Sequence, residues 1–219
     1  MRRTSALLLA LLLPGLLLVG AAACEFRSAI AVERAFPVPD YLAIDVALPT
    51  DAYRAAYAAL GDADPRDGVL AVWRAEAAAR GGMANAEIVR QTQAALRLAP
   101  ASARGWTLLA ESLAGSDPKG TERALGVALD LSPADFWLTP RQLVVAARLW
   151  PTLSADTRAA AVRRARLLWI EPSLRPAIPG LLAETKGPDL MMTALGTEEL
   201  RALNRWVAAE ERKKMETMK

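Results

Sequence analysis

The 219-residue sequence contains no histidine and only one cysteine, Cys24. The absence of histidine removes the commonest general base, the usual partner of a catalytic nucleophile and the commonest metal ligand. A single cysteine cannot form an internal disulfide, so packing must hold the fold together. The chain also lacks a glycine-rich phosphate loop, a nucleophile elbow and any nucleic-acid-binding motif. The sequence therefore predicts a protein that is not an enzyme, needs no metal or cofactor, and has no nucleic-acid partner.

Aromatic residues and long β-branched runs are scarce as well. Aromatic side chains account for 5% of the chain, whereas its 53% apolar fraction is dominated by alanine and leucine. Such a composition favours helix over strand at nearly every position. The net charge of +3 is too small to indicate a class of partner. We therefore expect an all-α fold.

The first 23 residues have the organisation of an export signal. Arg2 and Arg3 are followed by an apolar run from Leu7 to Val19, and residues 21–23 are all alanine. A short positive segment, an apolar segment and small residues at a cleavage site are the three parts of a secretory signal. Positive charge before the apolar run keeps the N-terminus in the cytoplasm and directs the remainder outward. We expect the protein to be exported across a bacterial inner membrane.

Three fates of this segment stay open. Cleavage after Ala23 would release a soluble periplasmic domain. Alternatively Cys24 would be lipidated, because the sequence Ala-Ala-Ala-Cys is similar to the bacterial lipobox, although Ala21 stands where that motif usually has leucine. In the third alternative the segment is a retained anchor, since residues 6–23 come close to the minimum length of a membrane span. The proline and glycine at 14–15 weaken a continuous helix and favour a signal over a span.

Beyond the signal, apolar residues recur at helical spacing between proline and glycine stops. Residues 24–50 carry prolines at 37, 39 and 49 and are expected to form an extended lead-in. Thr50 or Asp51 is expected to cap the first helix, and Ser102 a later one. The predicted helices span about residues 51–60, 68–80, 85–98, 103–115, 121–133, 141–150, 154–170 and 198–215.

Two of these helices end alike, 33 residues apart. Residues 94–100 read AALRLAP and residues 127–133 read VALDLSP, and a looser copy, RLLWIEP, follows at 166–172. Trp73 and Trp106 are also 33 residues apart, and both are expected to pack in the core. A period of this length indicates stacked two-helix units, none of which can bury its apolar face alone.

The repeat resembles the tetratricopeptide repeat family, whose unit is a helix pair of about 34 residues. The family pattern is matched by Trp106, Leu109, Ala110, Leu113, Leu125, Ala128 and Pro133, with Thr121 in place of the usual alanine. The preceding unit, which ends at Pro100, matches less closely.

The resemblance implies a short right-handed superhelix of antiparallel helix pairs, a tetratricopeptide-like α-solenoid, and protein–protein binding in the groove lined by the first helix of each pair. The implied segments are a signal or anchor (1–23), the lead-in (24–50), the helical repeats (51–172) and C-terminal capping helices (173–219). The solvent-facing candidates in the groove are Arg74, Arg104, Thr107 and Glu111.

Charge is distributed unevenly along the chain. From Arg141 to Gly180 there are seven arginines and two acids, whereas acids outnumber bases fifteen to eleven from Cys24 to Pro140. A solvated helix face would explain the arginines, and the functional alternatives are contact with anionic lipid headgroups or with an acidic polymer or protein. The candidate basic patch on the predicted helix 154–170 comprises Arg158, Arg163, Arg164 and Arg166.

Three acids and two tryptophans also have alternative explanations. Asp62, Asp64 and Asp67 lack the spacing of a calcium loop and are expected to cap a helix and to occupy turns. Trp137 and Trp206 either pack locally or belong to a binding surface.

Two functions of different classes fit these features. The first is an exported, noncatalytic adaptor that binds protein partners in the cell envelope, either in the soluble periplasm or on the periplasmic side of the inner membrane. By analogy alone, such proteins accompany machinery that assembles envelope polysaccharides or outer-membrane components. The alternative is a structural lipoprotein held at the membrane by Cys24 and the arginine-rich helices.

Overall fold

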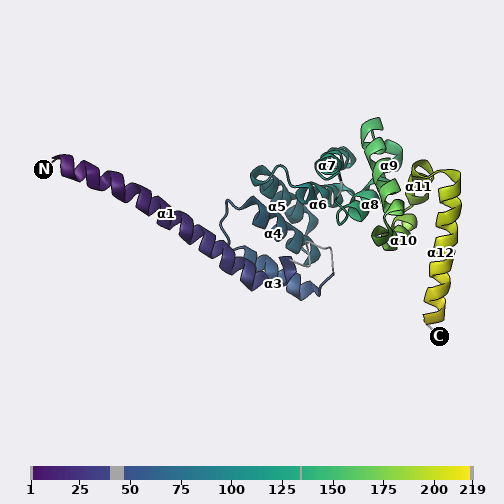
Figure 1. Ribbon diagram of the computed structural model, residues 1–219, viewed down its shortest axis with the longest axis horizontal. Helices are drawn as coiled ribbons and strands as arrows, with labels where there is room; N and C mark the ends of the chain where they lie inside the picture. The colour runs from purple at the N-terminus through teal and green to yellow at the C-terminus, as the bar shows by residue number, and fades with distance from the viewer. Residues whose placement is uncertain (1, 40–46, 134, 218–219) are drawn as a thin grey trace. The chain divides into compact units, whose positions relative to one another are not determined.

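The computed structural model describes residues 2–39, 47–133 and 135–217, except for the side chains of residues 2–17 and Lys214 (Figure 1). Every regular element within these residues is a helix, which confirms the predicted all-α class. The part of the expected lead-in at 40–46 lies outside the described residues.

The chain divides into two compact units, residues 1–100 and residues 101–219. The dividing point falls inside the predicted repeat segment 51–172, directly after Pro100. It therefore differs from the predicted segment boundaries at residues 50 and 172, and it separates the two helix pairs of the repeat pattern.

The described helices of the first unit pack in chain order. α1 (Arg2–Ala35) contacts α3 (Thr50–Leu60), α3 contacts α4 (Gly68–Arg80), and α4 contacts α5 (Asn85–Leu98). Trp73 packs against their shared core, as expected. This core consists of Ala31, Ala35, Val38, Tyr53, Ala56, Leu60, Ala63, Leu70 and Ala77. Its many alanines let the helix backbones approach closely while the larger side chains fill the remaining space.

The backbone of α1 departs from two expectations. It is helical without a break across residues 14–15, and it continues past Cys24 to Ala35. The expected extended lead-in is therefore wrong for residues 24–35. The reason is tertiary packing: Ala31 and Ala35 lie one turn apart on the same helix face and are buried against α3 (Figure 1). Residues 18–27, upstream of this contact, are exposed.

Local signals set the helix ends in the first unit. The Asp67 carboxylate accepts hydrogen bonds from the amides of Val69 and Leu70, both at 3.0 Å, and caps α4. Gly82, just past the end of α4, has a φ of +78°. The predicted ranges 68–80 and 85–98 are confirmed. The expected cap of α3 is wrong, because the N-cap position is Pro49 and no side chain bonds there.

The second unit is built around α7, α8 and α9, which contact one another. α6 packs against α7, α10 against α8, and α11 against both α8 and α9. The elements are α6 (Ala103–Leu113), α7 (Pro118–Leu131), α8 (Thr139–Leu149), the 3-10 turn η1 (Trp150–Thr152), α9 (Ala155–Ile170), the 3-10 turn η2 (Pro172–Ala177), α10 (Ile178–Ala183), α11 (Gly187–Ala194) and α12 (Thr197–Thr217).

Side-chain caps mark where α6 and α7 begin. Ser102 caps α6 by accepting a hydrogen bond from the Gly105 amide at 3.1 Å, as predicted. α7 begins at Pro118, ahead of the predicted start at Thr121. Asp117 accepts a hydrogen bond from the Gly120 amide at 2.9 Å, and proline suits the first helical position because it has no amide hydrogen to satisfy.

Two positions that match across the 33-residue offset are buried in both helix pairs, whereas a third, Leu98 and Leu131, is exposed in both. Ala95 and Ala128 are 2% and 0% exposed, and Leu96 and Leu129 are 6% and 3% exposed. α4 packs on α5 and α6 on α7, so each pair buries its matching alanine and the leucine after it within its own unit.

Candidate functional site

A cavity of about 460 Å³ opens on the first unit between the end of α3, the loop 61–67, α4 and α5. Its volume lies in the range of ligand pockets, roughly 300–1,000 Å³. Leu60, Leu70, Leu98 and several alanines provide its apolar lining. The polar and charged lining comprises Tyr57, Asp64, Asp67, Arg74, Glu87, Arg90 and Gln91.

Arg74 is the unpaired cation of this cavity. Its guanidinium stacks on the Tyr57 ring, 4.7 Å from the centroid, and its Nε–H is buried without a hydrogen-bond partner. Within the described residues the guanidinium forms no ion pair. Gly61 makes room for it, because a Cβ there would come within 3.2 Å of Arg74 Nη2. The cavity wall therefore carries a guanidinium whose charge no carboxylate neutralises by direct contact.

Tyr57, Glu87 and Gln91 form a hydrogen-bonded group beside Arg74. Nε2 of Gln91 donates to the Tyr57 hydroxyl at 2.8 Å and to Glu87 Oε1 at 2.6 Å, and Glu87 also pairs with Arg90. The bond from Gln91 holds the pKa of Glu87 below its ordinary value, with help from Arg90 and Arg74. Glu87 is therefore ionised at neutral pH and compensates Arg90.

Tyr57, Glu87 and Gln91 were not identified from the sequence as site residues. Glu87 and Gln91 are four residues apart on one helix, and that spacing is a signal that could have found them. Tyr57 lies 34 residues from Gln91 and on another helix, so only the packing of α3 on α4 and α5 shows that it belongs to the site.

The four predicted groove residues have different environments. Arg74 lines the cavity, and Arg104 is partly buried and engaged with the protein. The expectation that Thr107 faces solvent is wrong, because this residue is 0% exposed. Glu111 is held by Arg141 in a bidentate ion pair, with N–O distances of 2.8 and 2.6 Å. Of the four, Arg74 combines a cavity with unpaired charge.

Thr107 belongs to a buried polar network in the second unit. Its hydroxyl donates to the Ala103 carbonyl at 2.9 Å and accepts from Gln142 Nε2 at 3.1 Å. Gln142 is itself 0% exposed and donates to the Ser132 hydroxyl at 3.1 Å. Three helices therefore exchange hydrogen bonds in the core, because α6, the end of α7 and α8 each contribute a polar side chain.

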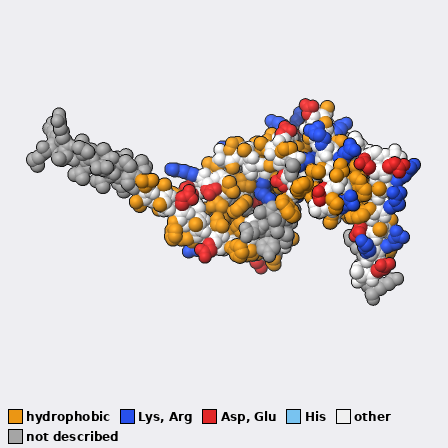
Figure 2. Space-filling model, viewed as in Figure 1, with side chains coloured by type: hydrophobic (Ala, Val, Ile, Leu, Met, Phe, Trp, Pro, Cys, Tyr) orange, Lys and Arg blue, Asp and Glu red, His pale blue; other side chains and the backbone are white. Residues whose placement is uncertain are grey.

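Only some of the four arginines of the predicted basic patch lie at the surface. Arg164 is 4% exposed, so its expected place on a solvated face is wrong. Arg158 donates to the Leu153 carbonyl at 3.1 Å and stacks over Trp150. Arg166 lies 3.7 Å from Glu199, and Arg163 is exposed. Figure 2 shows lysine and arginine side chains gathered over α9 and α12.

The three clustered acids have structural roles. Asp67 caps α4, Asp64 accepts a hydrogen bond from the Arg66 amide at 2.9 Å, and Asp62 pairs with Arg34 at 3.6 Å. The prediction that they cap a helix and occupy turns is confirmed. In the part of the chain that the structure describes, no group of three potential ligands is placed to hold a metal ion.

The two unassigned tryptophans differ in exposure. Trp137 is 53% exposed next to Phe136, which is 42% exposed. Trp206 is partly buried and lines a depression of about 410 Å³ with Pro172, Pro176 and Pro179. Trp137 is therefore available at the surface, whereas Trp206 is partly buried and faces a depression that it shares with prolines of η2 and α10.

No family model matches the chain, and neither does any curated protein or solved structure. Among the described residues, no helix is both long enough and apolar enough to cross a membrane. Cys24 is exposed on α1. The tetratricopeptide resemblance, export and lipidation stay predictions.

Proposed function

We propose that this protein is an exported, noncatalytic adaptor that binds protein partners in the bacterial cell envelope. The observation that carries the proposal is the cavity lined by α3, α4 and α5, with Arg74 unpaired in its wall. An open cavity that joins apolar surface to a few fixed polar groups is suited to binding the side chains of another protein. The partners proposed from the sequence are proteins that assemble envelope polysaccharides or outer-membrane components.

The helix arrangement supports a tetratricopeptide-like repeat as the scaffold. α4–α5 and α6–α7 are consecutive helices joined by short turns and packed together, which favours antiparallel pairs. The matching residues Ala95 and Ala128 are both buried, as are Leu96 and Leu129. A right-handed superhelix of such pairs would place α4, which carries Arg74, on the groove side.

A crosslinking experiment tests the adaptor. The tagged protein is crosslinked in intact envelopes, and the captured proteins are identified by quantitative mass spectrometry. We expect a reproducible set of envelope-assembly proteins that falls at least fivefold in Arg74→Gln. Arg97→Gln is the matched control, because Arg97 is exposed on α5 and outside the cavity lining. Equal capture by both variants would contradict a role for the cavity, provided that circular dichroism shows both to be folded.

The alternative is a lipid-tethered structural protein. It is supported by the short stretch of α1 between Cys24 and the first contacts with the rest of the unit. The first anchoring contacts after Cys24 come almost at once: Arg27 Nη2 donates to the Asp62 carbonyl at 3.2 Å, and Ser28 is buried. A lipid on Cys24 would thus hold the first unit directly at the membrane. Cys24→Ser should then move the protein to the soluble fraction, whereas membrane retention of the variant would exclude lipidation as the tether.

A further inference from the structure

A second pocket, on the other unit, is built between the C-terminal end of α7 and one face of α9. Its volume is about 400 Å³. The lining residues are Leu129, Pro133, Ala160, Arg163, Arg164 and Leu167. The four from α9 recur at intervals of three and four residues, so they share a face of that helix. The two arginines are the charged residues of this described lining, and the other four members are apolar.

Arg164 is held rigidly in the wall of this pocket. Only 4% of it is exposed, and its Nη1 donates to the Thr139 hydroxyl at 3.1 Å. Its Nη2 donates to the Leu129 carbonyl at 3.2 Å and to the Ser132 hydroxyl at 3.3 Å. These bonds use three of the five N–H donors of a guanidinium. The Nε–H and one Nη1 hydrogen are left for a further acceptor.

The charge of the two arginines is not neutralised by direct contact. Within the described residues neither forms an ion pair. The carboxylate that acts on Arg164 electrostatically is that of Asp135, which already accepts hydrogen bonds from the amides of Trp137 and Leu138. Burial lowers the pKa of Arg164 below its ordinary value, and the charge on Arg163 lowers it further, while Asp135 raises it. The pocket therefore keeps a positive potential in a partly dehydrated wall.

We propose that this pocket binds one oxyanion, a phosphate or carboxylate group, carried on an apolar chain. Guanidinium groups match the geometry of both anions, and a bond to a charged group strengthens where water is excluded. Leu129, Leu167 and Ala160 supply the apolar surface against which the chain of such a ligand would pack. Its source is either the headgroup region of a membrane lipid or a soluble acid.

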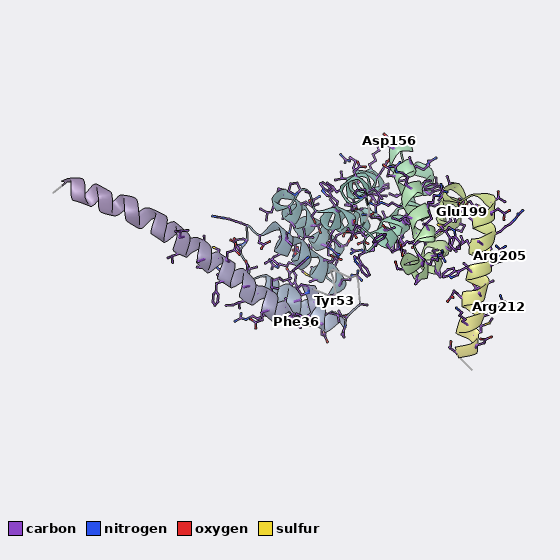
Figure 3. All side chains as sticks on the ribbon, in the orientation of Figure 1. Phe36, Tyr53, Asp156, Glu199, Arg205 and Arg212 are labelled. Carbon is purple, nitrogen blue, oxygen red and sulfur yellow. The ribbon has the colours of Figure 1, made fainter. Side chains whose placement is uncertain are left out.

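The test uses the full chain and hexyl phosphate as the probe, with hexanol as the uncharged comparison. Binding is followed by calorimetry and by the nitrogen shifts of the arginine Nε–H groups. Arg163→Gln removes the exposed arginine without breaking an observed hydrogen bond. Arg164→Lys keeps the positive charge but lacks the planar guanidinium with its several N–H donors. Arg205→Gln is the control, because Arg205 is exposed on α12 and lies outside the pocket (Figure 3).

We expect hexyl phosphate to bind and to shift the Arg164 Nε–H signal, and hexanol to do neither. Arg163→Gln and Arg164→Lys should each weaken binding about tenfold, as for the loss of one charge-assisted hydrogen bond, and Arg205→Gln should leave it unchanged. The proposal is overturned if hexyl phosphate does not bind the wild-type protein, or if Arg205→Gln weakens binding as much as Arg163→Gln does.

Vesicles then separate the two sources. If vesicles of phosphatidylglycerol and phosphatidylcholine retain the protein in an Arg163-dependent way, and phosphatidylcholine vesicles do not, the oxyanion belongs to a lipid. If hexyl phosphate binds while neither vesicle does, it belongs to a soluble acid. Either result supports the pocket, because both require the same arginines.

Discussion

The role of a given residue type depends on its surroundings in the fold. Thr107 and Thr193 both donate their hydroxyl to the carbonyl four residues earlier, at 2.9 and 2.8 Å. Thr107 is 0% exposed and also accepts a bond from Gln142, whereas Thr193 is exposed. The same residue type is therefore structural in one place and solvent-facing in the other.

Replacement by valine should change the free energy of unfolding differently at these two threonines. Thr107→Val keeps the shape of the side chain but removes one acceptor of Gln142 Nε2, which keeps Ser132 as a partner, so we expect the free energy of unfolding to fall by about 1 kcal/mol. Thr193→Val should change it by less than about 0.5 kcal/mol. Urea denaturation of both variants measures the difference. Equal values would show that the buried bond contributes nothing to stability.

Gly82 and Gly115 make a second pair of contrasting residues. An added Cβ would meet no atom within 4 Å at either position, but Gly82 alone of these two has a positive φ, +78°. Gly82→Ala should therefore destabilise the protein by about 1–2 kcal/mol, because an L-residue resists the left-handed region. Gly115→Ala should be neutral or slightly stabilising. Thermal unfolding of the two variants measures this, and equal shifts would mean that backbone strain is not the cause.

At the scale of elements, ion pairs connect helices that are distant in sequence. Arg141 on α8 pairs with Glu111 on α6. Arg148, also on α8, pairs with Glu184 just after α10, and the two N–O distances of this second pair are 3.0 and 2.8 Å. The charges on α8 thus orient that helix relative to α6 and α10.

Charge also suits the ends of individual helices. Asp156 and Glu199 are acids in the first turns of α9 and α12, where a negative charge interacts favourably with the helix dipole (Figure 3).

The Arg148–Glu184 pair should make stability depend on pH. Its hydrogen bonds hold the pKa of Glu184 below the ordinary value of 4.5. The stabilisation is therefore fully present above the ordinary value and is lost as the pH falls through the lower value of the folded state. The difference in unfolding free energy between wild type and Glu184→Gln should shrink as the pH falls from 7 to 3. Glu211→Gln, an exposed change on α12, is the control, and parallel curves for wild type and Glu184→Gln would refute this coupling.

At the scale of the whole molecule, the division after Pro100 gives each unit a core of its own. In the second unit Leu125, Leu143, Leu168 and Leu190 are each 0% exposed and come from α7, α8, α9 and α11. A core drawn from four helices of one unit is the condition for that unit to fold by itself.

A fragment of residues 101–219 should therefore fold alone. We expect a helical circular dichroism spectrum and a single cooperative thermal transition, since the buried leucines are all present in the fragment. Size-exclusion chromatography checks that the fragment is compact. A broad, noncooperative transition would show that this unit depends on residues 1–100.

Two arginines, Arg74 and Arg164, show how far the candidate sites could be predicted from the sequence. Arg74 was identified as a groove residue from its place in the repeat, and it lines the cavity. Arg164 was expected at the surface, yet its hydrogen bonds reach residues 25 to 35 positions away. No local pattern distinguishes these two arginines, because each is one of two or more basic residues in an alanine-rich helix.

The sequence by itself determined where most helices begin and end, because caps, glycine stops and helical periodicity act within a few residues. Asp67, Ser102 and Gly82 are such local signals, and the helices next to them lie within a few residues of prediction. Only the tertiary structure decided which polar residues are buried and where cavities open. The physical reason is that burial depends on which helices meet, and Thr107 and Arg164 are placed by partners in other helices.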